Sequence, residues 1–99
     1  MHEDHDEIKS DGGFYTPEWR AFSRTMTLEE RGFAFSIMLG MQHFGLSLPS
    51  PRDAAKTFGI TNQKASDLLV MFKGIPQDVV DGQMRRISEL PVALVEEML

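Results

Sequence analysis

The residues of this chain with the clearest chemical potential are a pair of amides and a scatter of cations. Asn62 and Gln63 are adjacent near the start of an expected helix, and such amides pair with adenine edges in the major groove of DNA. Lys64 and Ser66 lie on or beside the same outward face, where Asp67 opposes an anionic ligand. Five further cations are candidates for phosphate contacts around this face: Arg52, Lys56, Lys73, Arg85 and Arg86. The alternative is a solvated surface of mixed charge.

Residues that could support catalysis are few. The chain contains no cysteine, Tyr15 is its only tyrosine, and His43 is the only histidine after residue 13. No phosphate-binding loop, dinucleotide fingerprint or spacing of metal ligands is present. His2 and His5 lie among carboxylates, but we favour a solvated segment there over a metal site. The sequence therefore predicts a protein that is not an enzyme and has no cofactor.

The charge of the chain is concentrated at its start. Residues 1–13 carry five acidic residues and one lysine, or −4 of the total net charge of −5, which leaves the rest nearly neutral. We expect residues 1–13 to form a flexible acidic tail and residues 14–99 to form a single domain. The absence of cysteine, of a signal peptide and of a long apolar stretch predicts a cytoplasmic protein with no membrane contact.

Capping residues predict where the helices begin. Thr27 with Glu30 three residues later forms a capping box, so a long helix should start at Leu28 and end near Gly45. An earlier short helix should start at Pro17, with Trp19 on its buried side.

A helix-turn-helix pattern follows the long helix. Ser50 and Pro51 should start one short helix, and the sequence Gly59-Ile60-Thr61 should join it to a second helix that continues to Lys73. This second helix carries the amide pair and would be the recognition helix.

The stretch after the second helix is predicted to form a β-hairpin. Val79 and Val80 precede Asp81-Gly82, which is a strong signal for a tight turn between strands. A hairpin directly after a helix-turn-helix is a wing, and Arg85 and Arg86 would lie on it. The expected fold is thus mainly α-helical with a small β-hairpin, a winged helix-turn-helix.

Three stretches resemble a family of uncharacterised phage and prophage proteins. They are "FYTPEWRAFSRTMTLEERGFAFSIMLGMQHFG", "LSLPSPRDAAKTFGI" and "MFKGIPQDVVDGQMRRISE", and they cover roughly residues 14–89. The matching features include Leu-x-x-Glu-Arg-Gly before a long helix and a Leu-Pro turn after it. Members of the family carry a winged-helix domain like that of phage replication initiators. The resemblance implies this fold and a phage-type origin, and it departs at "SRTMT", where the family tends to have an acidic residue.

Two functions follow as hypotheses. The first is binding of duplex DNA in a replication-linked or regulatory role. The alternative is a protein-binding inhibitor or adaptor of phage origin that targets a basic, nucleic-acid-binding or defence complex of the host, to which the acidic tail would be attracted.

Homodimerisation is compatible with either function. The long helix is apolar on most sides, and its small residues suggest that another backbone packs close to it. The aromatic Trp19 segment could instead cover part of this surface. The candidate residues for a partner or dimer interface are Gly32, Phe35, Ser36, Leu39, Gly40, Leu94 and Met98.

Overall fold

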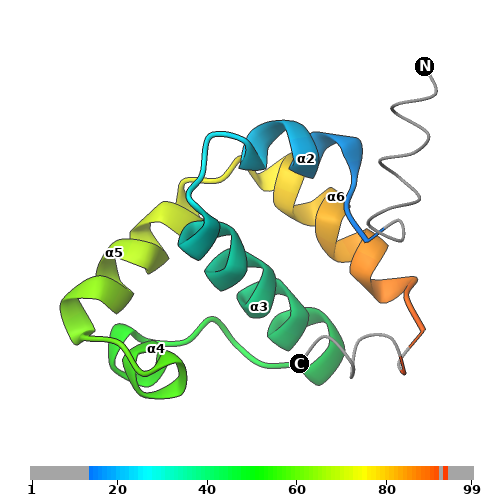
Figure 1. Ribbon diagram of the computed structural model, residues 1–99. Helices are drawn as coiled ribbons and strands as arrows, with labels where there is room; N and C mark the ends of the chain where they lie inside the picture. Colours follow the sequence, from blue (N-terminus) through cyan, green and yellow to red (C-terminus); the bar gives the residue numbers. More distant parts are fainter. Residues whose placement is uncertain (1–13, 92, 94–99) are drawn as a thin grey trace.

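The computed structural model describes residues 14–91 and residue 93, and these residues form helices but no β-strand. The helices are α2 (Pro17–Ser23), α3 (Leu28–Phe44), α4 (Pro51–Phe58), α5 (Asn62–Lys73) and α6 (Gln77–Ser88). Helix α3 runs through the centre, with α4 and α5 on one side and α2 and α6 on the other (Figure 1). None of the described helices is long and apolar enough to cross a membrane. The expected acidic tail, Leu94 and Met98 lie outside the described residues.

The helix starts predicted from capping residues are confirmed. The Thr27 hydroxyl accepts a hydrogen bond from the Glu30 backbone N–H at 3.1 Å, and the Glu30 carboxylate accepts one from the Thr27 N–H at 2.8 Å. The hydroxyl groups of Ser50 and Thr61 likewise accept a hydrogen bond from the backbone N–H three residues later, at the starts of α4 and α5. Gly59 ends α4 with a φ of 67°, a left-handed conformation that glycine adopts without steric strain. The expected helical pair around Gly59-Ile60-Thr61 is therefore present.

The predicted β-hairpin is wrong. Residues 77–88 form α6, which continues through Asp81-Gly82. A two-residue turn of the expected type needs a positive φ at both central residues, whereas Gly45 and Gly59 are the only described residues with a positive φ. Val80, Met84 and Ile87 recur at helical spacing, and Val80 and Ile87 are buried in the core. Burial of this helical face outweighs the local turn signal, so the fold is all-helical over the described residues and is not a winged helix-turn-helix.

Most of the apolar surface of α3 is covered within the chain, and only Leu28 and Phe44 at its two ends stay exposed among its large apolar residues. Helix α3 packs against α5 on one side and α6 on the other, which explains why it is apolar on most of its circumference. Phe35 and Leu39 are 9% and 2% exposed, so these two candidate interface residues belong to the core. Tyr15 packs edge-on against Phe35 with ring centroids 5.3 Å apart. The segment before α2 thus contributes to covering α3.

A buried amide holds that segment in place. The side chain of Gln83 on α6 is fully buried, and its Oε1 accepts a hydrogen bond from the Thr16 backbone N–H at 2.9 Å. Its Nε2 donates to the Phe14 carbonyl oxygen at 2.7 Å. Gln83 therefore pairs with backbone groups on both sides of Tyr15. This positions Tyr15 beside α3.

Candidate functional site

Helix α5 offers fewer free polar groups than its sequence suggested. The Gln63 amide donates to the Asp67 carboxylate at 3.0 Å, and Lys64 Nζ forms an ion pair with Glu29 of α3 at 2.9 Å. The hydrogen bond to Glu29 and the charge of Glu29 raise the pKa of Lys64. Ser66 is half-buried, while Asn62 is exposed. Gln63 and Lys64 are thus already occupied within the chain.

Two of the five cations expected around α5 lie away from it. Arg52 and Lys56 lie on α4, and Lys73 is the last residue of α5. Arg85 and Arg86 lie near the end of α6, and α3 separates that helix from the α4–α5 pair (Figure 1). The wing that was to carry both arginines beside the recognition helix is absent from the described residues. Arg85 and Arg86 therefore lie apart from the α4–α5 pair, which carries the other residues predicted to bind DNA.

The structure instead assembles a hollow between α2 and α3. Its volume is about 570 Å³, within the range of ligand-binding sites in proteins. The lining residues combine aromatic rings with arginines: Tyr15, Trp19, Arg20, Ser23, Arg24, Leu28, Arg31, Gly32, Phe35 and Ser36. We refer to this cavity as the α2–α3 hollow.

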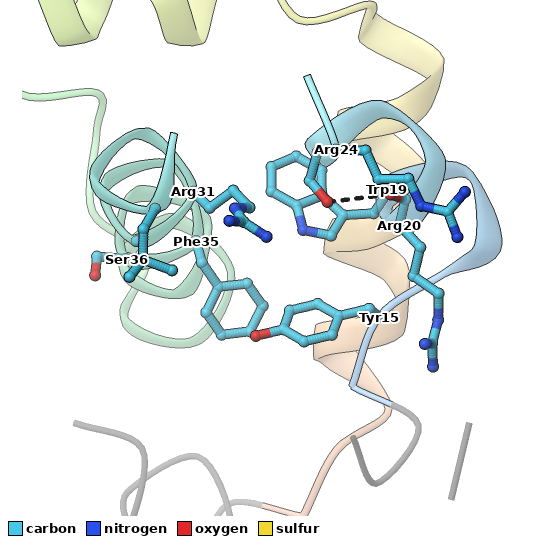
Figure 2. Close-up of a pocket in the computed structure, with 10 residues that line it drawn as sticks. Tyr15, Trp19, Arg20, Arg24, Arg31, Phe35 and Ser36 are labelled. Carbon is cyan, nitrogen blue, oxygen red and sulfur yellow. Dashed lines mark hydrogen bonds between the residues drawn. The ribbon is translucent and has the colours of Figure 1, made fainter. Parts of the chain in front are cut away.

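Arginines lie on two sides of a tryptophan in the α2–α3 hollow. Figure 2 shows the Arg31 side chain extending from α3 toward the Trp19 indole. The side chains of Arg20 and Arg24 extend from the α2 segment on the other side of the indole (Figure 2). The indole is 3% exposed, and the Tyr15 and Phe35 rings lie below it in this view. Arg31 thus extends toward the indole, whereas the guanidinium groups of Arg20 and Arg24 point away from Arg31 in this view (Figure 2).

The carboxylates nearest to Arg31 in the sequence are held by other groups. Glu29 pairs with Lys64, and Glu30 accepts the Thr27 N–H of the capping box. Within residues 14–91 and 93, Arg24 and Arg31 form no ion pair and no side-chain hydrogen bond. Both side chains are exposed. No group of the described residues thus occupies these guanidinium groups, and a guanidinium binds phosphate through two parallel hydrogen bonds.

The small residues of α3 leave the hollow open rather than packing against another backbone. A Cβ atom at Gly32 would meet nothing within 4 Å, and Ser36 beside it is exposed. At Gly40 a Cβ atom would contact only Leu46 Cδ1, at 3.4 Å. Ser36 and Gly40 also line a second hollow of about 140 Å³ beside Leu46 and Phe58. The expected close backbone packing is thus not found at these positions within the described chain.

The arginines of the hollow were not among the residues predicted from the sequence. A signal was present, because Arg20 and Arg24 alternate with Tyr15, Trp19 and Phe22, and basic residues interleaved with aromatic ones are typical of single-strand nucleic-acid sites. The contribution of Arg31 depends on how α3 lies against α2, which the spacing does not show. Gln83, which positions Tyr15, lies between Gly82 and Arg85 in the stretch that the sequence predicts to be a β-hairpin.

Comparison of the chain with protein-family models, with curated proteins and with solved structures finds no match. The resemblance to phage proteins therefore stays a prediction. The chemistry of the residues in the α2–α3 hollow is therefore the basis for a proposed function.

Proposed function

We propose that this protein binds nucleic acid without catalysing a reaction, and that its binding surface is the α2–α3 hollow. The observation that carries the proposal is the placement of Arg20, Arg24 and Arg31 from two helix segments around one aromatic wall. Phosphates supply the negative charge that these guanidinium groups bind, and bases supply flat faces for the rings. A replication-linked or regulatory role would use this binding.

The same observations favour this surface over α5. Duplex recognition by α5 would need outward donors and surrounding cations. Gln63 and Lys64 are paired within the chain, and the nearest cations are spread over three helices. In the hollow, Arg24 and Arg31 are exposed and lack such partners among the described residues. The hollow also combines its arginines with aromatic residues.

Salt dependence tests the electrostatic part of the proposal. Three arginine–phosphate contacts to a single strand give an expected slope of about −2 for the logarithm of the association constant against the logarithm of salt concentration. Fluorescence anisotropy with labelled oligonucleotides measures this slope. Absence of binding at low salt to any oligonucleotide, single-stranded or duplex, would overturn the proposal.

A matched pair of variants locates the binding surface. The double substitution Arg24→Gln and Arg31→Gln should weaken binding about tenfold, since two charged contacts are lost. The control, Arg52→Gln with Lys56→Gln, removes the same charge from exposed positions on α4 and should leave affinity within about twofold. Equal losses in the two double variants would show that net charge and not the hollow governs binding.

As a second candidate we propose an adaptor or inhibitor that binds a basic protein. The supporting observation is the charge of −4 on residues 1–13. Removing residues 1–11 should weaken attachment to a basic protein and leave nucleic-acid binding unchanged or stronger. A pull-down with and without nuclease distinguishes a direct protein partner from one that is bridged by nucleic acid.

A further inference from the structure

The shape of the α2–α3 hollow bears on which form of nucleic acid it can accept. A duplex is read by a protruding element, such as a helix that enters the major groove. The hollow is concave, so it would receive a protruding group from the ligand instead. An unpaired base that is turned out from its strand is such a group, whereas the bases of a duplex are stacked and paired.

Cations lie on both sides of the hollow, as binding of a strand that passes across it would require. Arg31 lies on one side of the Trp19 indole, and Arg20 and Arg24 lie on the other (Figure 2). A base within a strand has a phosphate on each side of it along the backbone. With its base in the hollow, the strand would present one phosphate to α3 and the next to the α2 segment.

The interior of the hollow offers contacts for a base and the space to admit one. Tyr15 is half-buried and offers an accessible aromatic face, whereas Trp19 and Phe35 are buried, and the exposed Ser36 hydroxyl can donate to or accept from a base edge. Gly32 contributes no side chain, and a Cβ atom built there would meet nothing within 4 Å. The glycine therefore keeps the entrance beside Arg31 open.

We propose that the α2–α3 hollow binds one unpaired base of a single-stranded nucleic acid, with Arg31 and the Arg20–Arg24 pair on the flanking phosphates. This inference rests on the proposed function and adds that single strands are preferred over duplexes. Contacts of the base inside the hollow favour single strands over duplexes, because phosphate contacts alone do not distinguish these two forms of nucleic acid.

Trp19 provides a probe inside the proposed site, since it is the only tryptophan of the chain. A thymidine oligonucleotide of roughly 10 nucleotides, within the site sizes of single-strand-binding domains, should change its emission on titration. The same probe annealed to its complement should bind about tenfold more weakly, the difference expected from one stacked base.

A steric variant tests the hollow without removing charge. Gly32→Leu places a side chain in the opening and should weaken single-strand binding about tenfold, the affinity attributed to one base. Gly32→Ala is the control at the same position, because a methyl group there contacts nothing and should leave binding within about twofold. Circular dichroism and urea unfolding of both variants establish that each is folded.

The outcomes separate this inference from the proposed function. Duplex binding equal to or tighter than single-strand binding would overturn the inference and leave nucleic-acid binding in place. Anisotropy that reports binding while Trp19 emission stays constant, or a Gly32→Leu variant that binds normally, would also overturn it. Binding of polyglutamate as tightly as the thymidine oligonucleotide would show that the hollow recognises negative charge alone, and it would overturn the inference. No binding of either nucleic acid would overturn both proposals.

Discussion

The α4–α5 pair and the α2–α3 hollow both carry cations and polar groups, but their tertiary surroundings differ. On α5, Lys64 is paired with Glu29 and Gln63 with Asp67. In the hollow, Arg24 and Arg31 have no such partners among the described residues. Residue types therefore show which groups could bind a ligand. Tertiary contacts decide which of those groups are still available.

One ion pair connects the two regions. Glu29 lies on α3, two residues before Arg31, and its carboxylate binds Lys64 of α5. This pairing neutralises a cation on the predicted recognition helix. It therefore weakens anion binding at α5.

The largest expected effect comes from dismantling the hollow through Gln83. Gln83→Ala leaves the Thr16 N–H and the Phe14 carbonyl without their partners and opens a cavity, so the free energy of unfolding should fall by about 3 kcal/mol. Urea denaturation measures this change. Gln77→Ala on the same helix removes an exposed amide that bonds only to Asp81, and it should cost less than about 0.5 kcal/mol. Similar losses for the two variants would contradict the role given to Gln83.

Two cap substitutions of similar size separate stability from binding. Thr27→Ala and Thr61→Ala each remove a hydroxyl that accepts from a backbone N–H, so each should lower the free energy of unfolding by about 1 kcal/mol. Thr27 starts the helix that carries Arg31, whereas Thr61 starts α5. Only Thr27→Ala should also weaken single-strand binding. A selective loss of binding in Thr61→Ala would move the site to α5.

A glycine substitution tests the helical assignment of residues 77–88. Gly82 lies within α6, and a Cβ atom there would meet nothing within 4 Å. Gly82→Ala should therefore raise the free energy of unfolding by about 0.7 kcal/mol, through helix propensity. In the turn of a β-hairpin the same change would be destabilising, because alanine disfavours a positive φ. The sign of the change in thermal midpoint decides between the two structures.

The smallest effect concerns the ion pair between the regions. Glu29→Gln should lower the pKa of Lys64 toward 10.5, since Glu29 is the largest cause of its elevation. Because the folded pKa is raised, the pair stabilises the fold below pH 10.5 and loses its effect as the pH rises through the folded pKa. NMR titration of the Lys64 side chain follows this change. An unchanged pKa in the variant would show that the pair does not persist in solution.

The sequence predicts the boundaries of some helices correctly and misses others. Thr27 with Glu30, Ser50 and Thr61 located the starts of three helices, and Gly59 located an end. The same local reasoning failed at Asp81-Gly82, where a strong turn signal was set against the helical recurrence of Val80 and Ile87. That competition was decided by packing against α2 and α3, which the local signal does not contain.

The sequence by itself determined the features that depend on neighbours a few residues apart. A cap is a hydrogen bond between residues three positions apart, and its geometry is fixed by residue type and spacing. Only the tertiary structure decided that Gln83 would hold Thr16, 67 positions away, and that Lys64 would pair with Glu29. The α2–α3 hollow depends on such contacts, because its walls come from separate helices whose relative position is set by burial of the shared core.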